Sequence, residues 1–193
     1  MLLEPLTIDL KRESTALGTI ETCLFYGDGS NVRNQEFAQP VFDVLARLGR
    51  PASLVLCRGQ RDVVQDIVEE LGLTFWRQHF QDESTWLERL LKIPSGWFVA
   101  QLAPEPSDAL VRFAVDLWRS IRTPWFVFAV PPSEQLELSK PEVERFEQAS
   151  SAWVEPTGHE GLMLSTRASR TSLRAALAKV LHPAWQQRIV EHD

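Results

Sequence analysis

The sequence contains little cysteine and little histidine. Its two cysteines, Cys23 and Cys57, both lie in apolar, strand-like stretches. Two cysteines do not build a disulfide framework, so we interpret both as buried free thiols. The four histidines show no H-x-x-x-H spacing and have no C-x-x-C motif beside them, which argues against a metal site. We therefore expect neither a metal nor a cofactor.

Long apolar runs and an excess of basic residues are also missing. No run approaches the roughly 20 residues that cross a membrane, and the first residues, Met1–Leu6, lack the basic and apolar regions of a signal peptide. The 20 Lys and Arg are outnumbered by 26 Asp and Glu, which gives a net charge of −6. General nucleic-acid binding depends on a basic surface and is not expected. These absences predict a cytoplasmic protein that does not bind membranes.

Tryptophan, by contrast, is abundant, with seven residues in a chain of 193. An exposed tryptophan is a natural anchor for a protein partner, because tryptophan is enriched among the residues that dominate binding energy. The length and the apolar fraction of 44% are those of an ordinary globular protein. We predict a single α/β domain over residues 1–193.

Strand-like and helical patterns alternate between residues 19 and 130. We expect strands near 20–26, 53–57, 73–77, 97–102 and 125–130, and helices that start near 39, 62, 86 and 108. Most of these strands are apolar along their whole length, which is typical of a parallel sheet covered on both faces. The pattern therefore predicts a three-layer sandwich with a mostly parallel, doubly wound (flavodoxin-like) sheet.

One of these helices has a clear start signal. Thr85 and Glu88 have the spacing of a capping box, in which each side chain bonds the backbone of the other residue. We expect Leu87, Leu90 and Leu91 of this helix to face the core.

The two ends of the chain extend the βα series. Residues 2–10 are expected to form an edge strand in a hairpin with 19–26. In the C-terminal extension, about 131–193, we expect a possible antiparallel strand pair at 153–155 and 161–166. A last helix is predicted at 170–181, with Leu173, Ala176, Leu177 and Val180 facing inward.

The loop Gly27–Asn31 follows the first predicted strand and is one candidate site. Loops at the carboxyl ends of parallel strands are the usual place for ligands in such folds. The loop matches neither G-x-x-x-x-G-K-[ST] nor G-x-G-x-x-G, and its residues are also ordinary turn formers. Together with residues after the second and third strands, the ligand-binding candidates are Asp28, Ser30, Asn31, Arg58, Arg61 and His79.

Within this set, Arg58 and Arg61 would clamp a phosphate or carboxylate. His79 and Asp28 are weak catalytic candidates, as an acid/base pair. The alternatives are solvated arginines beside a helix start and a solvated loop histidine. No catalytic motif is present, so the sequence leans away from an enzyme without excluding one.

An acidic stretch is the second candidate site. It is a partner-binding surface or simply a solvated helix face, and its members are Glu134, Glu137, Glu142, Glu144 and Glu147. An acidic surface attracts and steers a basic partner.

Two functions remain open. The first is a non-catalytic protein-interaction module, such as an immunity or accessory protein. It would bind another protein through an acidic and aromatic surface, and a basic partner would suit this surface. The alternative is an enzyme or sensor that binds a nucleotide-like or phosphorylated small molecule at the carboxyl edge of the sheet.

Overall fold

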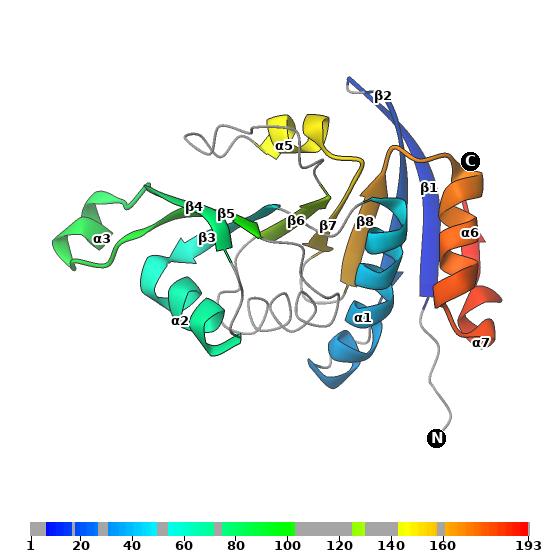
Figure 1. The fold of residues 1–193 in the computed structure, drawn as a ribbon, viewed down its shortest axis with the longest axis horizontal. Coiled ribbons are helices and arrows are strands. Elements are labelled where there is room, and N and C mark those ends of the chain that lie inside the picture. Colours follow the sequence, from blue (N-terminus) through cyan, green and yellow to red (C-terminus); the bar gives the residue numbers. More distant parts are fainter. Residues whose placement is uncertain are drawn as a thin grey trace.

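The computed structural model describes residues 7–16, 18–26, 31–49, 54–71, 75–102, 125–129, 143–157 and 161–192 (Figure 1). Its strands are β1 (Thr7–Thr15), β2 (Gly18–Tyr26), β3 (Leu54–Gln60), β4 (Phe75–Asp82), β5 (Ser95–Leu102), β6 (Trp125–Ala129), β7 (Ala152–Thr157), β8 (Gly161–Thr166) and β9 (Ile189–Glu191). Its helices are α1 (Asn31–Leu48), α2 (Arg61–Leu71), α3 (Trp86–Leu90), α5 (Val143–Ala149), α6 (Arg170–Val180) and α7 (Pro183–Gln186).

Within these ranges the strands form one mixed sheet in the order β4-β5-β3-β6-β7-β8-β2-β1-β9. The β1–β9 pair is parallel. The other neighbouring strands in this order are all antiparallel. The predicted mostly parallel, flavodoxin-like sheet is therefore wrong.

The reason for this error is visible in β6, whose residues are covered on both faces. Val127 belongs to the core on the α1 side of the sheet. Phe128 packs against Phe146 of α5 on the other side, with ring centroids 5.8 Å apart. A strand buried on both faces is apolar along its whole length whatever the direction of its neighbours, so composition does not distinguish the two kinds of sheet.

The predicted terminal hairpins are present with shifted bounds. β1 and β2 pair antiparallel as far as Thr15↔Gly18, so the polar stretch 11–15 belongs to β1 instead of forming the turn. Gly18 has a φ of 105°, a backbone conformation that favours glycine after this turn. β7 and β8 pair antiparallel, and they lie within the sheet between β6 and β2.

The larger core lies between the sheet and the helices α1, α6 and α7. Figure 1 shows α1 and α6 side by side over one half of the sheet. Leu173, Ala176 and Leu177 of α6 are buried as predicted, and Val180 packs partly buried against this core. Helix α1 begins at Asn31 rather than near Gln39, so Pro40 lies inside it. The prediction that Pro40 marks the first turn was wrong.

The chain after α6 forms two elements that the sequence did not indicate. Pro183 is the first residue of α7, where the absence of an N–H costs nothing. Trp185 is buried in the core, and β9 then pairs with β1. None of the helices in the described part of the chain combines the length and apolar character that crossing a bilayer requires.

Candidate functional site

The most unusual feature of the surface is α3, which is carried at the end of the β4–β5 hairpin. Figure 1 shows it at one extremity of the molecule, far from α1 and α6. β4 and β5 pair from Phe75↔Leu102 to Asp82↔Gly96. A side chain at Gly96 would collide with the carbonyl oxygen of Gln81, so a glycine is needed where the two strands approach most closely.

Hydrogen bonds close the base of the hairpin end. The Asp82 carboxylate accepts from the Ser84 N–H, with an N···O distance of 2.8 Å, and from the Ser84 hydroxyl. These hydrogen bonds hold the pKa of Asp82 below its ordinary value. The Ser84 oxygen accepts from the Ser95 N–H at 2.9 Å, and the Glu83 N–H donates to the Ser95 carbonyl at 2.9 Å. The chain therefore leaves β4 and enters β5 along a defined path.

The capping box predicted at the start of α3 is confirmed. The Thr85 N–H donates to Glu88 Oε2 at 2.7 Å, and the Glu88 N–H donates to Thr85 Oγ1 at 3.3 Å. At the other end, the Ile93 N–H donates to the Glu88 carbonyl at 2.9 Å, and Lys92 turns the chain with a φ of 56°. Local hydrogen bonds thus form α3 without help from a core.

The apolar side chains of α3 point into solvent. Trp86 is 76% exposed, Leu87 51%, Leu90 70% and Leu91 59%. At about 100° per residue these four positions share one arc of the helix surface. The prediction that Leu87, Leu90 and Leu91 face the core is wrong, because α3 lies at a hairpin end that has no sheet beneath it. We call these four residues the α3 tip.

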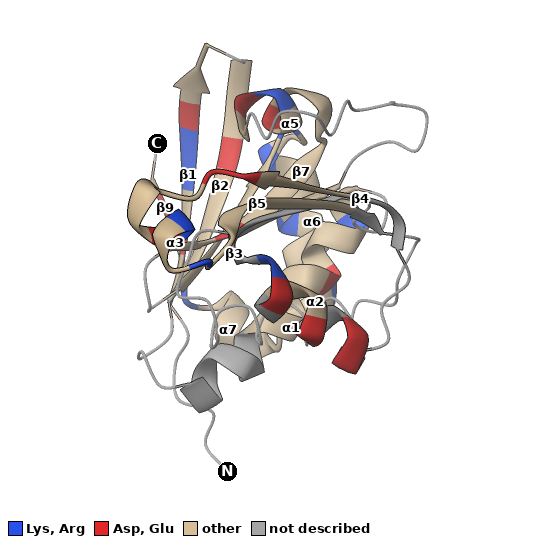
Figure 2. Ribbon diagram, turned by 90° about the vertical axis from the view of Figure 1, so that its left-hand side faces the viewer, with Lys and Arg blue, Asp and Glu red and all other residues tan. Residues whose placement is uncertain are grey.

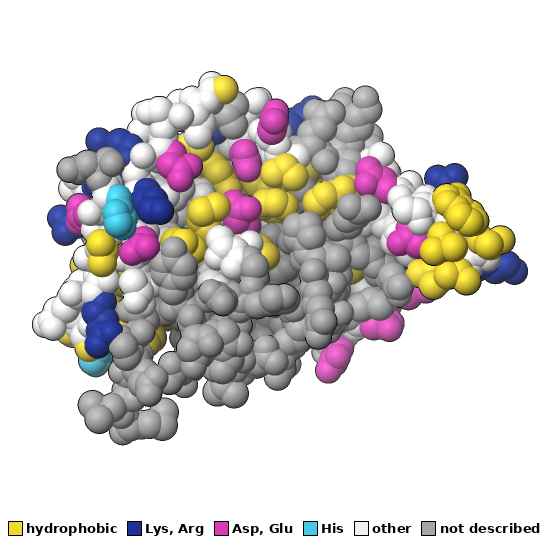
Figure 3. All heavy atoms as spheres, turned by 180° about the vertical axis from the view of Figure 1, so that it is seen from behind, with side chains coloured by type: hydrophobic (Ala, Val, Ile, Leu, Met, Phe, Trp, Pro, Cys, Tyr) yellow, Lys and Arg dark blue, Asp and Glu magenta, His cyan; other side chains and the backbone are white. Residues whose placement is uncertain are grey.

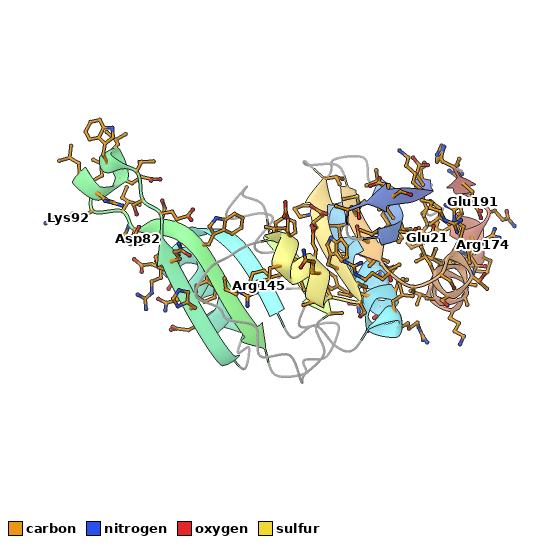
Figure 4. All side chains as sticks on the ribbon, turned by 90° about the horizontal axis from the view of Figure 1, so that it is seen from above. Glu21, Asp82, Lys92, Arg145, Arg174 and Glu191 are labelled. Carbon is orange, nitrogen blue, oxygen red and sulfur yellow. The ribbon has the colours of Figure 1, made fainter. Side chains whose placement is uncertain are left out.

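Charged groups border the α3 tip in an ordered way. In Figure 3 the apolar side chains at the end of the molecule have basic groups at their outer edge and acidic groups towards the body. Figure 4 shows Lys92 at the far end and Asp82 at the base of the hairpin end. Arg89 and Lys92 are both exposed, whereas Asp82 and Glu88 are engaged in the hydrogen bonds described above.

The predicted ligand-binding residues are not brought together where the structure describes them. Arg61 starts α2, and its guanidinium lies over the Phe80 ring at 5.9 Å from the centroid. His79 lies within β4 instead of in a loop. Neighbouring strand residues point to opposite faces, and Phe80 packs on the α1 side of the sheet. His79 therefore faces away from Arg61.

The structure describes only some of the remaining ligand-binding candidates. Asp28 and Ser30 lie outside the described residues, Asn31 is the first residue of α1, and Arg58 lies in β3 opposite Trp97 of β5. The flavodoxin-like order that paired His79 with Asp28 is absent, because five strands separate β4 from β2. The described residues contain no group of three or more His, Cys, Asp and Glu that would hold a metal.

Of the predicted acidic surface, Glu144 and Glu147 lie on α5, and Glu134, Glu137 and Glu142 lie outside the described residues. Burial and the neighbouring Glu144 raise the pKa of Glu147. Burial and then the Glu147 charge raise the pKa of Glu155, on β7, to about 7. Burial thus disfavours the ionised forms of Glu147 and of the neighbouring Glu155. A second acidic group lies on α2 (Figure 2), formed by exposed Asp62, Asp66, Glu69 and Glu70.

A cluster of charged side chains around buried Glu21, at the opposite end of the sheet, has a structural role. Glu21 of β2 is 4% exposed and binds the Nε atoms of Arg12 and Arg170 at 2.6 and 2.9 Å. Arg174 of α6 binds Glu191 of β9 at 2.6 Å (Figure 4). These pairs join β1, β2, α6 and β9.

Cys23, beside them in β2, is a buried free thiol as predicted, and burial raises its pKa far above the ordinary value, so it is not a reactive nucleophile.

Comparison with known proteins gives no likeness from which a function could be transferred. No family model matches the chain, and no curated protein or solved structure shows significant similarity to it. The geometry of the α3 tip is therefore the basis for a functional proposal.

Proposed function

We propose that the protein is a non-catalytic interaction module that docks onto another protein through the α3 tip. The observation that carries this proposal is a preformed helix with four large apolar side chains in solvent. The largest contiguous apolar patch on a soluble monomer typically measures about 300–600 Å² and is often a functional interaction site. Trp86 is the natural anchor, because a buried tryptophan contributes strongly to binding.

The order of the hairpin end favours binding further. A backbone segment that is already ordered loses less conformational freedom when a partner covers it. The closed base at Ser84 and the capping box at Thr85 supply this order at the backbone of α3. An immunity or accessory protein, which acts by occupying a partner, needs such an element and no catalytic residue.

The alternative function, binding of a nucleotide-like or phosphorylated small molecule, gains no support from the described residues. Arg61 and His79 lie on opposite sides of β4, and an anion at one of them would not be reached by the other. The acidic groups on α2 and α5 would also repel a phosphate.

A pair of matched substitutions tests the proposal. Leu90→Asn makes the α3 tip polar, and Val190→Asn makes the same kind of change at an apolar residue of β9 that is 45% exposed. Wild-type protein and both variants are immobilised separately on a resin and incubated with lysate of the producing cells. Any protein that the resin retains is purified, and its affinity for each of the three proteins is measured by calorimetric titration. We expect Leu90→Asn to weaken binding at least about 30-fold, a cost of roughly 2 kcal/mol typical of an interface hot spot, and Val190→Asn to bind like wild type. Equal affinity for all three proteins, or no retained protein, would contradict the proposal.

A further inference from the structure

We infer that the α3 tip occupies an apolar groove on a different protein, and that the outer rim of this groove is acidic. This inference rests on the proposed function and adds the chemistry of the partner. It follows from the size of the tip and from the placement of the charges around it.

The size of the tip argues against a second copy of this chain as the occupant. With about 200 Å² for a large side chain, the four exposed residues present roughly 500 Å² of apolar surface. Two tips in contact would bury about 1,000 Å² in total, below the 1,200–2,000 Å² of a stable interface. The tip is also convex, so a second tip offers it no concave surface. A groove covers more of a projecting helix and brings the flanking charges into the contact.

The charges around the tip indicate what the rim of the groove carries. Arg89 and Lys92 are exposed, and Figure 4 shows Lys92 at the far end of the hairpin, where a partner would arrive first. The Glu88 carboxylate is engaged by the Thr85 N–H, and the Asp82 carboxylate by Ser84 at the base. The charge of Arg89 contributes to the lowered pKa of Asp82, so Arg89 acts partly on the base of the hairpin end. Lys92 is the cation at the outer end, where carboxylates on the partner would complement it.

An anionic lipid membrane also combines an apolar interior with a negatively charged surface. The charge of the rest of the protein disfavours binding to such a membrane. The chain carries a net charge of −6, and the acidic groups on α2 and α5 are exposed or partly exposed. Glu83, at the base of the hairpin end, is exposed as well. Insertion of the tip would bring this negative charge towards anionic headgroups, which repel it. An acidic rim limited to the outer edge of a protein groove would contact Lys92 and leave this negative charge outside the interface.

Zero-length cross-linking at Lys92 tests the inference directly. The retained protein of the titration above is mixed with wild-type protein and treated with a carbodiimide, which joins an amine to a carboxylate in direct contact. We expect an amide between Lys92 Nζ and an Asp or Glu of the partner, located by mass spectrometry. Lys92→Arg keeps the charge but lacks the amine, so it should bind normally without that amide. Lys92→Glu should bind about tenfold more weakly, with the difference reduced in high salt.

Three outcomes would overturn the inference, and they are distinguishable from failure of the proposed function. If Leu90→Asn weakens binding but Lys92→Glu does not and no amide forms at Lys92, the docking function stands and the acidic rim is wrong. If wild-type protein, but not Leu90→Asn, binds vesicles of phosphatidylcholine and phosphatidylglycerol, the occupant is a membrane. If sedimentation of the protein alone shows a dimer that Leu90→Asn dissociates, the occupant is a second copy. If Leu90→Asn has no effect on binding, the proposed function itself fails.

Discussion

Glu21 and Glu155 are both glutamates of the sheet, but Glu21 has cationic neighbours and Glu155 has an anionic one. Glu21 is buried between the guanidinium groups of Arg12 and Arg170, which supply two charge-assisted hydrogen bonds. Glu155 lies beside Glu147, another carboxylate, and burial together with that charge raises its pKa to about 7. The buried position of Glu21 is therefore compensated, whereas the ionised form of Glu155 is disfavoured in the folded protein.

The raised pKa of Glu155 predicts a pH dependence of stability. The unfolded chain binds the proton of this residue with an ordinary pKa of 4.5, and the folded protein with a pKa of about 7. The protonated side chain contributes to the free energy of unfolding. This contribution is fully present below pH 4.5 and is lost as the pH rises to about 7, which lowers the free energy of unfolding by at most about 3 kcal/mol. Glu155→Gln should remove this loss, so it should stabilise the protein at pH 8 and change little at pH 4.5. Urea unfolding at both pH values measures the difference.

The control for this prediction is Glu70→Gln on α2, where the side chain is exposed. A carboxylate in solvent contributes little to the difference between folded and unfolded states. Glu70→Gln should therefore leave the stability nearly unchanged at both pH values. A Glu155→Gln variant that is no more stable than wild type at pH 8 would show that the carboxylate is not penalised by burial.

At the scale of the element, α3 is a short helix whose stability comes from its ends. Helices of five residues are unstable in isolation, because nucleation costs more than the few hydrogen bonds return. α3 buries none of its residues, so its capping box and the closed base of the hairpin must hold it. The apolar arc is consequently free for a partner instead of being used for folding.

Removal of the cap should loosen α3 without unfolding the protein. Thr85→Ala deletes the side chain that accepts from the Glu88 N–H, a change that costs about 1 kcal/mol in typical helices. We expect faster hydrogen exchange at the amides of residues 88–93 and weaker partner binding, with an unchanged melting temperature. Thr171→Ala, at an exposed position of α6 that is not a cap, is the matched control. Unchanged exchange in Thr85→Ala would mean that other contacts order α3.

The limits of prediction from sequence are also clearest at this scale. The capping box at Thr85 and the inward face of α6 follow from local patterns, and both are present. The direction in which the apolar arc of α3 faces cannot be predicted from a local pattern, because it depends on where the helix lies relative to the sheet. β4 continues through residues 78–82, which are polar except for Phe80, and brings α3 to a hairpin end. In the sequence, the apolar spacing of this exposed helix is the same as that of a helix that packs on a core.

The sheet order was beyond sequence reasoning for a related reason. β3 and β4 are consecutive strands joined through α2, yet β5 lies between them. The predicted βα alternation describes the order of elements along the chain but not their order in space, which is decided by contacts between distant residues. The same holds for Glu21, whose partner Arg170 is 149 residues away. Local patterns contain no sign of such a pair.

The molecule as a whole is joined by its sheet, which runs without interruption from β4 to β9 in the described residues. Phe98 of β5, near the end that carries α3, and Leu10 of β1, near the opposite end, belong to one buried cluster with α1 between them. Because packing continues from one end to the other, local loss of structure at one end exposes apolar surface shared with the rest. From this continuity we propose that the chain folds as one domain.

The prediction at this scale is one cooperative unfolding transition. Phe98→Ala and Leu10→Ala each remove a buried side chain that is at most 2% exposed, and each should cost about 2–5 kcal/mol. In a protein of this size, each variant should lower the melting temperature by roughly 4–20 °C. Scanning calorimetry should show a single peak in both variants, with equal calorimetric and van't Hoff enthalpies. Two peaks, one moved only by Phe98→Ala and the other only by Leu10→Ala, would show that the two ends of the sheet belong to separate folding units. The α3 tip would then be carried by a unit independent of the charge cluster at Glu21.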